Sequence, residues 1–213
     1  MTEEEARNWI QGNFSVSRET WDRLERYVAL LLAEMAQQNL IAESTRPHIW
    51  ARHIVDSAQL LPLTLEAGEG GWVDLGSGAG LPGVVVAILS DRPMMMIESR
   101  RKRIDFLRHV LDELQLHHAQ IWGGRVETAP RCAAAVISAR AYAPLSRLFP
   151  SALHLSSPDT IWVLPKGRNA ENELEAARPT WQGVFHVERS VTDADSSIIV
   201  ARSVEPLGRK GQG

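Results

Sequence analysis

The stretch VDLGSGAGLPG, from Val73 to Gly83, most constrains the fold of this chain, because it places four glycines between two apolar runs. A glycine-rich turn between a strand and a helix lets a ligand approach the backbone and meet the unpaired N–H groups of the helix start. Two registers fit the stretch: Gly76, Gly78 and Gly80 at alternate positions, or the G-x-G-x-x-G spacing of dinucleotide-binding folds from Gly78 onward. The stretch therefore predicts a nucleotide-type site and leaves its ligand open.

From residue 71 onward, short β-rich runs alternate with helical patterns. Such alternation predicts βαβ units and a mainly parallel sheet with helices on both faces. The last two runs are separated only by TDAD, so they predict an antiparallel hairpin. The predicted fold is therefore α/β, a Rossmann-like class I methyltransferase sheet of seven strands that ends in this hairpin. The predicted strands are residues 71–75, 94–98, 118–122, 133–138, 160–164, 184–191 and 196–204.

The residues before the glycine stretch have a helical pattern instead. Apolar residues recur at helical spacing from Ser17 to Gln38, and Ser17 is placed to cap the start of this helix. A second helix is predicted to begin at Pro47, with a buried stripe made of Trp50, Ile54, Ala58 and Leu61. We therefore expect residues 1–66 to form a helical extension packed on the core, and residues 67–213 to form the methyltransferase domain.

Composition narrows the class of protein. With 213 residues and a formal net charge of −3, the chain is long enough for one α/β domain plus an appendage. Its apolar runs are far shorter than the roughly 20 residues that span a bilayer, and its acidic N-terminus does not resemble a signal peptide. We expect a cytoplasmic protein with no membrane partner. The single cysteine, Cys132, excludes a Cys-based zinc site, so no metal is expected, and the run RCAAAVIS predicts that its thiol is buried.

The residues around the glycine stretch favour S-adenosylmethionine over a dinucleotide. Glu98 closes the predicted strand 94–98, about 20 residues beyond the glycines, where a ribose-binding carboxylate is expected with either ligand. Asp74 lies inside the first strand, where dinucleotide folds are usually apolar, and the terminal hairpin does not fit a second dinucleotide half. S-adenosylmethionine is therefore the favoured cofactor, and an NAD-dependent oxidoreductase is the alternative.

Several sequence blocks resemble the RsmG (GidB) family of bacterial methyltransferases. They lie in order between Asn39 and Gly167: NLIAESTRPHIWARHIVDS, VDLGSGAGLPG, IESRRKRIDFLRHVLDEL, GRVE, ISARAYAPL and LPKG. The resemblance implies methyl transfer to N7 of one guanine of 16S rRNA, guanine 527, either in naked rRNA or in the small ribosomal subunit. We expect a monomer. A noncatalytic RNA-binding module with the same fold is a third hypothesis.

The resemblance also implies which residues bind the cofactor. The glycine stretch and the leucine after it would line the cofactor, and the GRVE block would flank the adenine. The acid at position 98 would hold the ribose, and the arginine immediately before the AYA sequence would sit at the mouth of the pocket. In chain order, these residues are Gly76, Gly78, Gly80, Leu81, Glu98, Val126, Glu127 and Arg140.

The block RHIVDS offers further site residues. On a helix, Arg52, His53 and Asp56 can meet on neighbouring turns. Guanine N7 already has an available lone pair, so methyl transfer to it needs no general base. We therefore expect His53, Asp56 and Arg140 to position the site rather than to take a proton.

Basic residues near the carboxyl ends of the strands predict the RNA contacts, because Lys and Arg contacts to phosphates dominate nucleic-acid affinity. Lys166, after strand 160–164, is the first candidate. Tyr142 either stacks on a splayed base or is a partly buried loop aromatic. The other candidates are Arg168 and the run Arg100, Arg101, Lys102 and Arg103.

Overall fold

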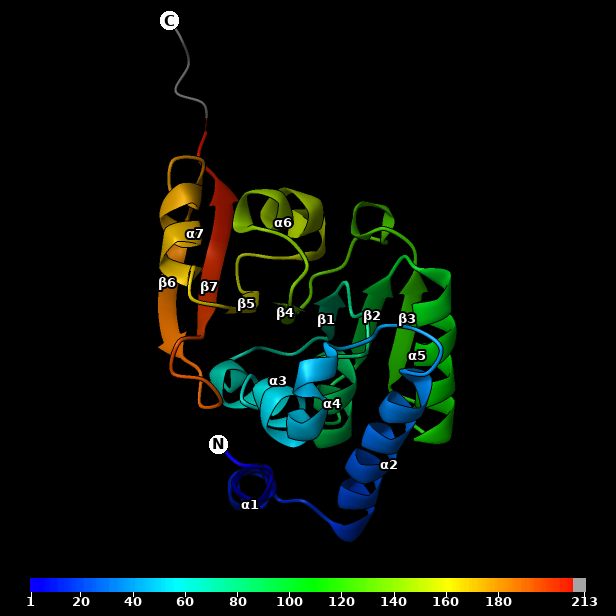
Figure 1. The fold of residues 1–213 in the computed structure, drawn as a ribbon. Helices are drawn as coiled ribbons and strands as arrows, with labels where there is room; N and C mark the ends of the chain where they lie inside the picture. Colours follow the sequence, from blue (N-terminus) through cyan, green and yellow to red (C-terminus); the bar gives the residue numbers. More distant parts are fainter. Residues whose placement is uncertain (209–213) are drawn as a thin grey trace, which may run out of the picture.

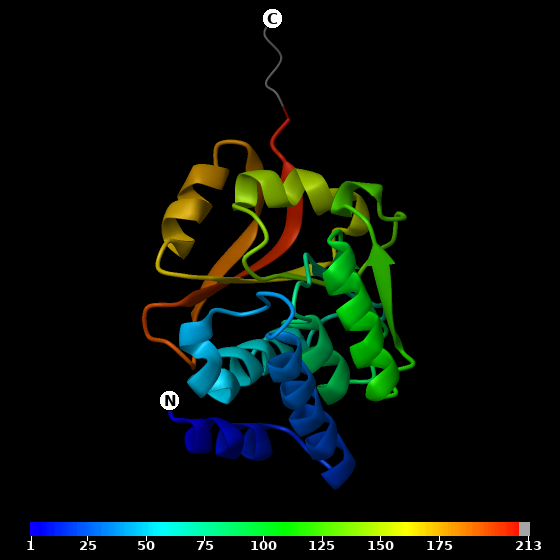
Figure 2. The ribbon, with the colours of Figure 1, turned by 45° about the vertical axis from the view of Figure 1, so that its right-hand side comes forward.

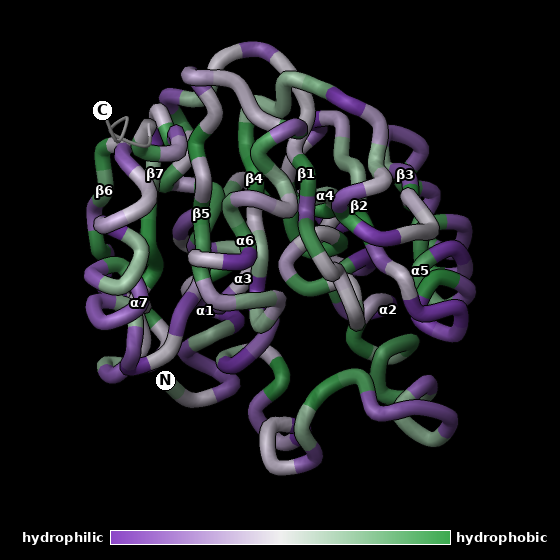
Figure 3. The backbone as a smooth tube through the Cα atoms, turned by 90° about the horizontal axis from the view of Figure 1, so that it is seen from above, coloured by the Kyte–Doolittle hydropathy of each residue, from purple (hydrophilic) through white to green (hydrophobic). Residues whose placement is uncertain are grey.

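One mixed sheet of seven strands forms the centre of the computed structural model, which describes residues 1–208. Residues 209–213 of the predicted second domain lie outside this range. The strand order is β3-β2-β1-β4-β5-β7-β6, which Figure 3 shows from one edge to the other. The first five strands pair in parallel. The strands are β1 (Trp72–Leu75), β2 (Met94–Glu98), β3 (Ala119–Gly123), β4 (Val136–Ala139), β5 (Ile161–Lys166), β6 (Trp181–Arg189) and β7 (Ser197–Pro206).

Strand β7 runs antiparallel to both of its neighbours, β5 and β6. Its residues from Ile198 to Ala201 are buried, whereas most of β6 is exposed, as expected for an inner strand and an edge strand. The predicted antiparallel hairpin is therefore confirmed. Its connection, residues 190–196, is longer than the predicted TDAD and extends toward the helices that precede the sheet.

Helices cover both faces of the sheet. Figure 1 shows α6 and α7 on one side and α1, α3 and α4 on the other, and the turned view in Figure 2 places α2 with the second group. Within residues 1–208, no helix is long and apolar enough to cross a membrane. The α-helices are α1 (Glu3–Asn13), α2 (Arg18–Glu34), α3 (Asp56–Ala58), α4 (Gly83–Leu89), α5 (Arg101–Glu113), α6 (Leu145–Ala152) and α7 (Ala170–Ala177).

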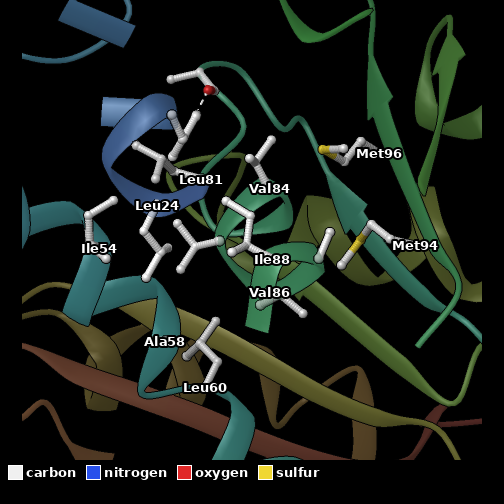
Figure 4. Close-up of a cluster of buried hydrophobic side chains, with 14 of the residues drawn as sticks. Leu24, Ile54, Ala58, Leu60, Leu81, Val84, Val86, Ile88, Met94 and Met96 are labelled. Atoms are coloured by element: carbon white, nitrogen blue, oxygen red, sulfur yellow. Dashed lines mark hydrogen bonds between the residues drawn. The ribbon is translucent and has the colours of Figure 1, made fainter. Parts of the chain in front are cut away.

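Helix α4 is buried because it lies between the sheet and the N-terminal helices. Figure 4 shows its side chains between Met94 and Met96 of β2 on one side and Leu24 of α2 and Ile54 on the other. All four of these side chains are buried, and burying a large aliphatic side chain contributes about 1.5–3 kcal/mol. The same hydrophobic cluster thus includes residues on both sides of position 66. The predicted domain boundary at this position stays a prediction.

Asp74 is the polar exception in the otherwise apolar strand β1. Trp72 Nε1 donates to Ser138 Oγ at 2.8 Å, and the Ser138 hydroxyl donates to Asp74 Oδ1 at 2.7 Å. Asp74 Oδ2 has no hydrogen-bond partner among the described residues. Burial raises the pKa of Asp74 to about 6, because a buried carboxylate loses its hydration. Asp74 thus links β1 to β4 at the base of the glycine turn.

The helical segment before β1 differs from the single helix predicted from Pro47. Pro47 lies inside a 3-10 helix rather than at a first helical position. A 3-10 helix is wound more tightly than an α-helix, and Pro47 has no N–H to donate to it. Leu61, predicted in the buried stripe, is only partly buried. The segment consists of η1 (Glu43–His48), the π-helical turn η2 (Trp50–Val55), α3 and the short η3 (Leu61–Thr64).

The sequence prediction omits helices α1 and α7. Helix α1 begins with a capping box: the Glu5 N–H donates to Thr2 Oγ1, and the Thr2 N–H donates to the Glu5 carboxylate. The pattern T-x-x-E that marks this start is visible in the sequence. Helix α7 follows β5 and packs on the same face of the sheet as α6, so its first turn lies close to the carboxyl end of β5.

The predicted burial of Cys132 is wrong. Strand β4 begins only at Val136, and Cys132 lies in the exposed connection before it. The Cys132 thiol lies 3.6 Å from the carbonyl oxygen of Leu155, and its partial burial raises the pKa of the thiol. An apolar run such as AAAVIS shows that a strand is present but does not fix its first residue.

Candidate functional site

The glycine stretch forms the turn between β1 and α4. Gly76 and Gly80 have φ values of +65° and +92°, a region that L side chains rarely adopt. A Cβ on Gly76 would lie 2.7 Å from Cδ2 of Tyr142, so this ring packs directly on bare backbone. A Cβ on Gly80 would instead lie 2.5 Å from a methyl of Val84. The turn therefore brings its backbone against Tyr142 at one end and against the core at the other.

Glu98 closes β2 and holds the glycine turn with its carboxylate. Its Oε2 accepts the N–H of Gly78 at 2.9 Å, and its Oε1 accepts those of Ser99 and Arg100 at 2.7 and 2.8 Å. The guanidinium of Arg103 lies 3.9 Å from Oε2. These charge-assisted bonds stabilise a carboxylate that is almost fully buried. A carboxylate has about four lone-pair sites, so the three backbone bonds leave one on Oε2.

A cavity of about 430 Å³ opens beside the glycine turn and Glu98, and we call it the glycine-loop cavity. It brings together Gly76, Glu98, Val126 and Glu127 of the predicted cofactor-binding residues. The Glu127 carboxylate lies 3.4 Å from Arg125, whose hydrogen bond lowers the pKa of Glu127. Four predicted residues from three separate loops therefore face one space.

A second cavity, of about 480 Å³, lies at the carboxyl ends of β4 and β5, and we call it the β4–β5 cavity. Ala141 and Tyr142 line both cavities, so the two spaces meet at these residues. Ala141 has a φ of +53°, which is uncommon for a residue other than glycine. Open α/β sheets bind their ligands at the carboxyl ends of the strands. The two adjoining cavities occupy this edge.

Arg140 connects β4 to the helices that precede the sheet. Its Nη1 donates to Asp56 Oδ2 and to His53 Nδ1, both at 3.2 Å. The three predicted positioning residues are therefore in contact. Arg52 does not meet Asp56 as the helical spacing predicts, but pairs with Asp193 at 2.7 Å. Arg52 misses Asp56 because it lies in a π-helical turn. The i→i+5 hydrogen bonds of this turn rotate residues four apart onto different faces of the helix.

The ring of His53 is held in one tautomer. Thr45 Oγ1 donates to the carbonyl of Ala42 at 2.7 Å, so it accepts from His53 Nε2 at 2.8 Å. His53 Nδ1 then accepts from Arg140. Burial, with the charges of Arg140 and Arg52, lowers the pKa of His53 to about 3. Both ring nitrogens are engaged, so His53 is not free to take a proton from a substrate.

The connection between β6 and β7 forms one wall of the β4–β5 cavity. Gln59 Oε1 accepts the N–H of Val191 at 2.8 Å. Asp56 Oδ1 accepts from Thr192 Oγ1 at 3.1 Å and from Gln59 Nε2 at 3.0 Å. The ion pair of Arg52 with residue 193 adds a third link. The N-terminal helices therefore hold this wall in place.

Lys166 ends β5 and lines the same cavity, but its ammonium already has partners. Its Nζ lies 2.8 Å from Glu173 Oε2 and donates to the carbonyl of Ala143 at 3.0 Å. Glu173 Oε2 also accepts the N–H of Leu145 at 3.3 Å. The Lys166 side chain is only 10% exposed. A phosphate contact from Lys166 stays a prediction, and it would compete with the Glu173 ion pair.

The other predicted RNA contacts lie in different places. Arg100 and Arg103 line the glycine-loop cavity, so they belong to the surroundings of Glu98. Arg101 and Lys102 are exposed on α5. Arg168 is exposed beside the β6–β7 connection, where it pairs with an acid at 2.9 Å. These five cations therefore do not form one patch.

Four predicted cofactor-binding residues do not line the glycine-loop cavity. Leu81 is buried in the core, as Figure 4 shows, and Gly80 faces the core as well. Gly78 gives its N–H to Glu98. Arg140 lines the β4–β5 cavity instead. Roles for these residues in cofactor binding stay predictions.

Sequence reasoning missed several residues of the β4–β5 cavity. They come from α6, α7 and the β6–β7 connection. These segments are separate in the sequence, so no single short motif contains the residues. Their position after a strand or at a helix start is the only signal that the sequence offers. These residues are Arg147, Glu173, Thr192 and Asp193.

Comparison with known proteins decides the family. The family described as rRNA small subunit methyltransferase G (GidB) matches residues 20–201, most of the chain. The chain belongs to this family. A ribosomal RNA small subunit methyltransferase G from Sphingopyxis alaskensis is 56% identical over 93% of this chain and 85% of that protein. One from Rhizorhabdus wittichii is 53% identical over 100% of this chain and 97% of that protein.

Solved structures of methyltransferases are similar to this chain in fold. The glycopeptide N-methyltransferase MtfA complexed with (S)-adenosyl-L-methionine has a TM-score of 0.57 at 10% identity, covering 70% of this chain and 94% of that one. An O-methyltransferase from Bacillus cereus in complex with SAH has a TM-score of 0.57 at 14% identity, covering 92% and 96%. The predicted class I fold is confirmed. Family and fold together identify an S-adenosylmethionine-dependent methyltransferase and leave the NAD-dependent alternative without support.

Proposed function

We propose that the chain transfers a methyl group from S-adenosylmethionine to N7 of guanine 527 in 16S rRNA. The observation that carries the proposal is the meeting of two cavities at Ala141 and Tyr142. One cavity holds residues suited to a nucleoside cofactor, and the other offers a polar space for a base. The names of the relatives, which specify small-subunit ribosomal RNA, support the substrate class.

The glycine-loop cavity fits S-adenosylmethionine by its donor and acceptor groups. The remaining lone pair of Glu98 Oε2 would accept a ribose hydroxyl. The other three lone pairs of the carboxylate accept the backbone N–H groups that hold the turn in place. Val126 and Glu127, at the far side of this cavity, would flank the adenine. The bare backbone of Gly76 admits the ring of Tyr142, and both residues line the cavity that would hold the cofactor.

The proposed reaction needs positioning rather than proton removal. Bound S-adenosylmethionine would supply the methyl group of its sulfonium: the N7 lone pair would form a bond to the methyl carbon while the electrons of the broken carbon–sulfur bond stay on sulfur. N7 carries no proton, which agrees with a His53 ring whose nitrogens are both engaged. Holding two reactants in line contributes about 7–11 kcal/mol in well-oriented systems. Tyr142, which lines both cavities, would orient the base.

Labelled methyl transfer tests the proposal. The purified chain is incubated with methyl-labelled S-adenosylmethionine and small ribosomal subunits from cells that lack the modification. We expect the label in 16S rRNA, recovered as 7-methylguanosine. Subunits that already carry the modification serve as the control and should accept no label. Label in another nucleoside would refute the N7 assignment, and no transfer to either naked rRNA or subunits would favour the noncatalytic RNA-binding module.

A further inference from the structure

We propose that Glu173 and Lys166 recognise the Watson–Crick edge of the target guanine in the β4–β5 cavity. This role rests on the proposed function and assigns the residues that select the base.

Most charged side chains that line the β4–β5 cavity neutralise one another. Across the described chain, Arg147 is the only charged lining residue without an oppositely charged side-chain partner. A cavity balanced in this way suits an uncharged polar base better than a phosphate, which needs unpaired cations. The ion pairs are Arg52–Asp193, Arg140–Asp56 and Lys166–Glu173.

Glu173 is the carboxylate with spare capacity. Asp56 uses both of its oxygens, one for Arg140 and the other for Gln59 and Thr192. Glu173 uses only Oε2, and its Oε1 has no hydrogen-bond partner in residues 1–208. Its side chain is 29% exposed, so a ligand in the cavity can reach it.

Lys166 has one donor left beside this acceptor. An ammonium has three N–H donors, and two of them point to Glu173 and to the carbonyl of Ala143. Both residues line the cavity, and in the described chain their ion pair leaves one carboxylate oxygen and one ammonium N–H without a partner. Guanine presents the matching pattern, since N1–H and the 2-amino group are donors and O6, beside them, is an acceptor. Adenine places an acceptor at N1, which would face the carboxylate.

This arrangement leaves N7 free for the reaction, because N7 lies on the other side of O6 from N1. Methylation gives the purine a positive charge, so N1–H becomes a stronger donor as the new bond forms. A carboxylate at this edge then binds the transition state more tightly than the ground state, which is the condition for faster catalysis. Glu173 is thus a specificity residue that also contributes to the rate.

The test compares guanosine with inosine, which lacks only the 2-amino group, at the target position of 16S transcripts reconstituted into small subunits. For the wild-type chain we expect kcat/KM to fall on inosine by roughly ten- to a hundred-fold, the usual loss when a charged group loses its hydrogen-bond partner. Glu173→Gln should lower kcat/KM on guanosine and bring the guanosine-to-inosine ratio close to one.

The geometry explains why glutamine is the informative change. The N–H groups of Lys166 and Leu145 fix an oxygen at the position of Oε2, so the amide nitrogen of Glu173→Gln takes the position of Oε1. A donor then faces the donors of guanine. Glu171→Gln, an exposed change in the first turn of the same helix, is the matched control and should leave the ratio unchanged.

Two further measurements separate the possible failures. The affinity for S-adenosylmethionine and the unfolding temperature of Glu173→Gln should equal those of Glu171→Gln, which shows that the fold is intact. If Glu173→Gln keeps the guanosine-to-inosine ratio of the wild-type chain, the recognition role is overturned. It is also overturned if the wild-type chain methylates inosine as fast as guanosine. Failure of the wild-type chain to methylate guanosine at this position overturns the proposed function itself.

Discussion

Arg140 Nη1 and Asp56 Oδ2 lie 3.2 Å apart and join the end of β4 to the helices that precede the sheet. The same Asp56 carboxylate accepts from Thr192 of the β6–β7 connection. Three parts of the chain that are distant in the sequence therefore meet at one carboxylate. The shape of the β4–β5 cavity depends on this junction, so changes here are expected to affect both stability and activity.

Replacing Asp56 with alanine should loosen this junction. The change leaves the Arg140 guanidinium and the Thr192 hydroxyl without their acceptor, which costs about 1–3 kcal/mol. We expect a lower free energy of unfolding by denaturant and faster hydrogen exchange in residues 190–196, together with reduced methyl transfer. Asp91→Ala, at an exposed position with no side-chain partner in the described chain, is the control. Unchanged exchange in residues 190–196 would show that Asp56 does not hold the connection.

His53 should make the chain less stable in acid. The folded state keeps the imidazole neutral, with a pKa of about 3 instead of 6.5, so protons bind preferentially to the unfolded state as the pH falls below about 6.5. At pH 5 this linkage costs about 2 kcal/mol relative to neutral pH. His53→Gln should therefore lose less stability than the wild type between pH 7 and pH 5.

The control for this comparison is His109→Gln, an exposed change on α5. Asp74 titrates in the opposite sense, because its raised pKa of about 6 lets the folded state bind a proton more readily. This contribution is present in all three proteins and cancels in the difference. Equal pH dependence of unfolding in His53→Gln and in the wild type would contradict the neutral, buried state of His53.

Gly76→Ala should weaken cofactor binding more than it weakens the fold. The new Cβ would lie 2.7 Å from the ring of Tyr142, at a φ of +65°, and such strain costs about 1–3 kcal/mol. Calorimetric titration with S-adenosylmethionine should show a large loss of affinity in a folded protein. Gly12→Ala, in a helix with open space around it, should bind normally. Wild-type affinity in Gly76→Ala would place the cofactor elsewhere.

Glu98→Gln should also lower the affinity for S-adenosylmethionine. The neutral amide cannot accept all three backbone N–H groups and a ribose hydroxyl, and hydrogen bonds to a charged group contribute about 1.5–3 kcal/mol. We expect roughly a ten- to a hundred-fold rise in Kd. Glu69→Gln, at an exposed loop position, is the matched control. If both variants bind equally well, Glu98 supports the turn but does not contact the ribose.

Much of the fold was predictable because its signals are local. Strand β2 matches the predicted residues 94–98, and the cap at Ser17 is present, since Ser17 Oγ accepts the N–H of Thr20. The hairpin was predictable for the same reason. The π-helical turn was not, because the residues from Trp50 to Val55 carry an ordinary helical pattern.

The candidate site was predictable only in part. Residues within motifs, such as Glu98 and Glu127, were found because their position after a strand fixes where they lie. The ion pair of Arg52 with Asp193 joins residues 141 positions apart, and no spacing rule connects them. The pairing of Lys166 with Glu173 was hidden for a related reason, because helix α7 was not predicted.

The proposed activity is tested in the cell by mapping 7-methylguanosine in 16S rRNA from cells with and without the gene. Reduction followed by aniline treatment cleaves RNA at this nucleoside, so the position can be read from the length of the fragments. We expect a single cleavage at guanine 527 that disappears without the gene and returns when the gene is restored. Cleavage at guanine 527 that persists without the gene, or loss of cleavage at another position, would contradict it.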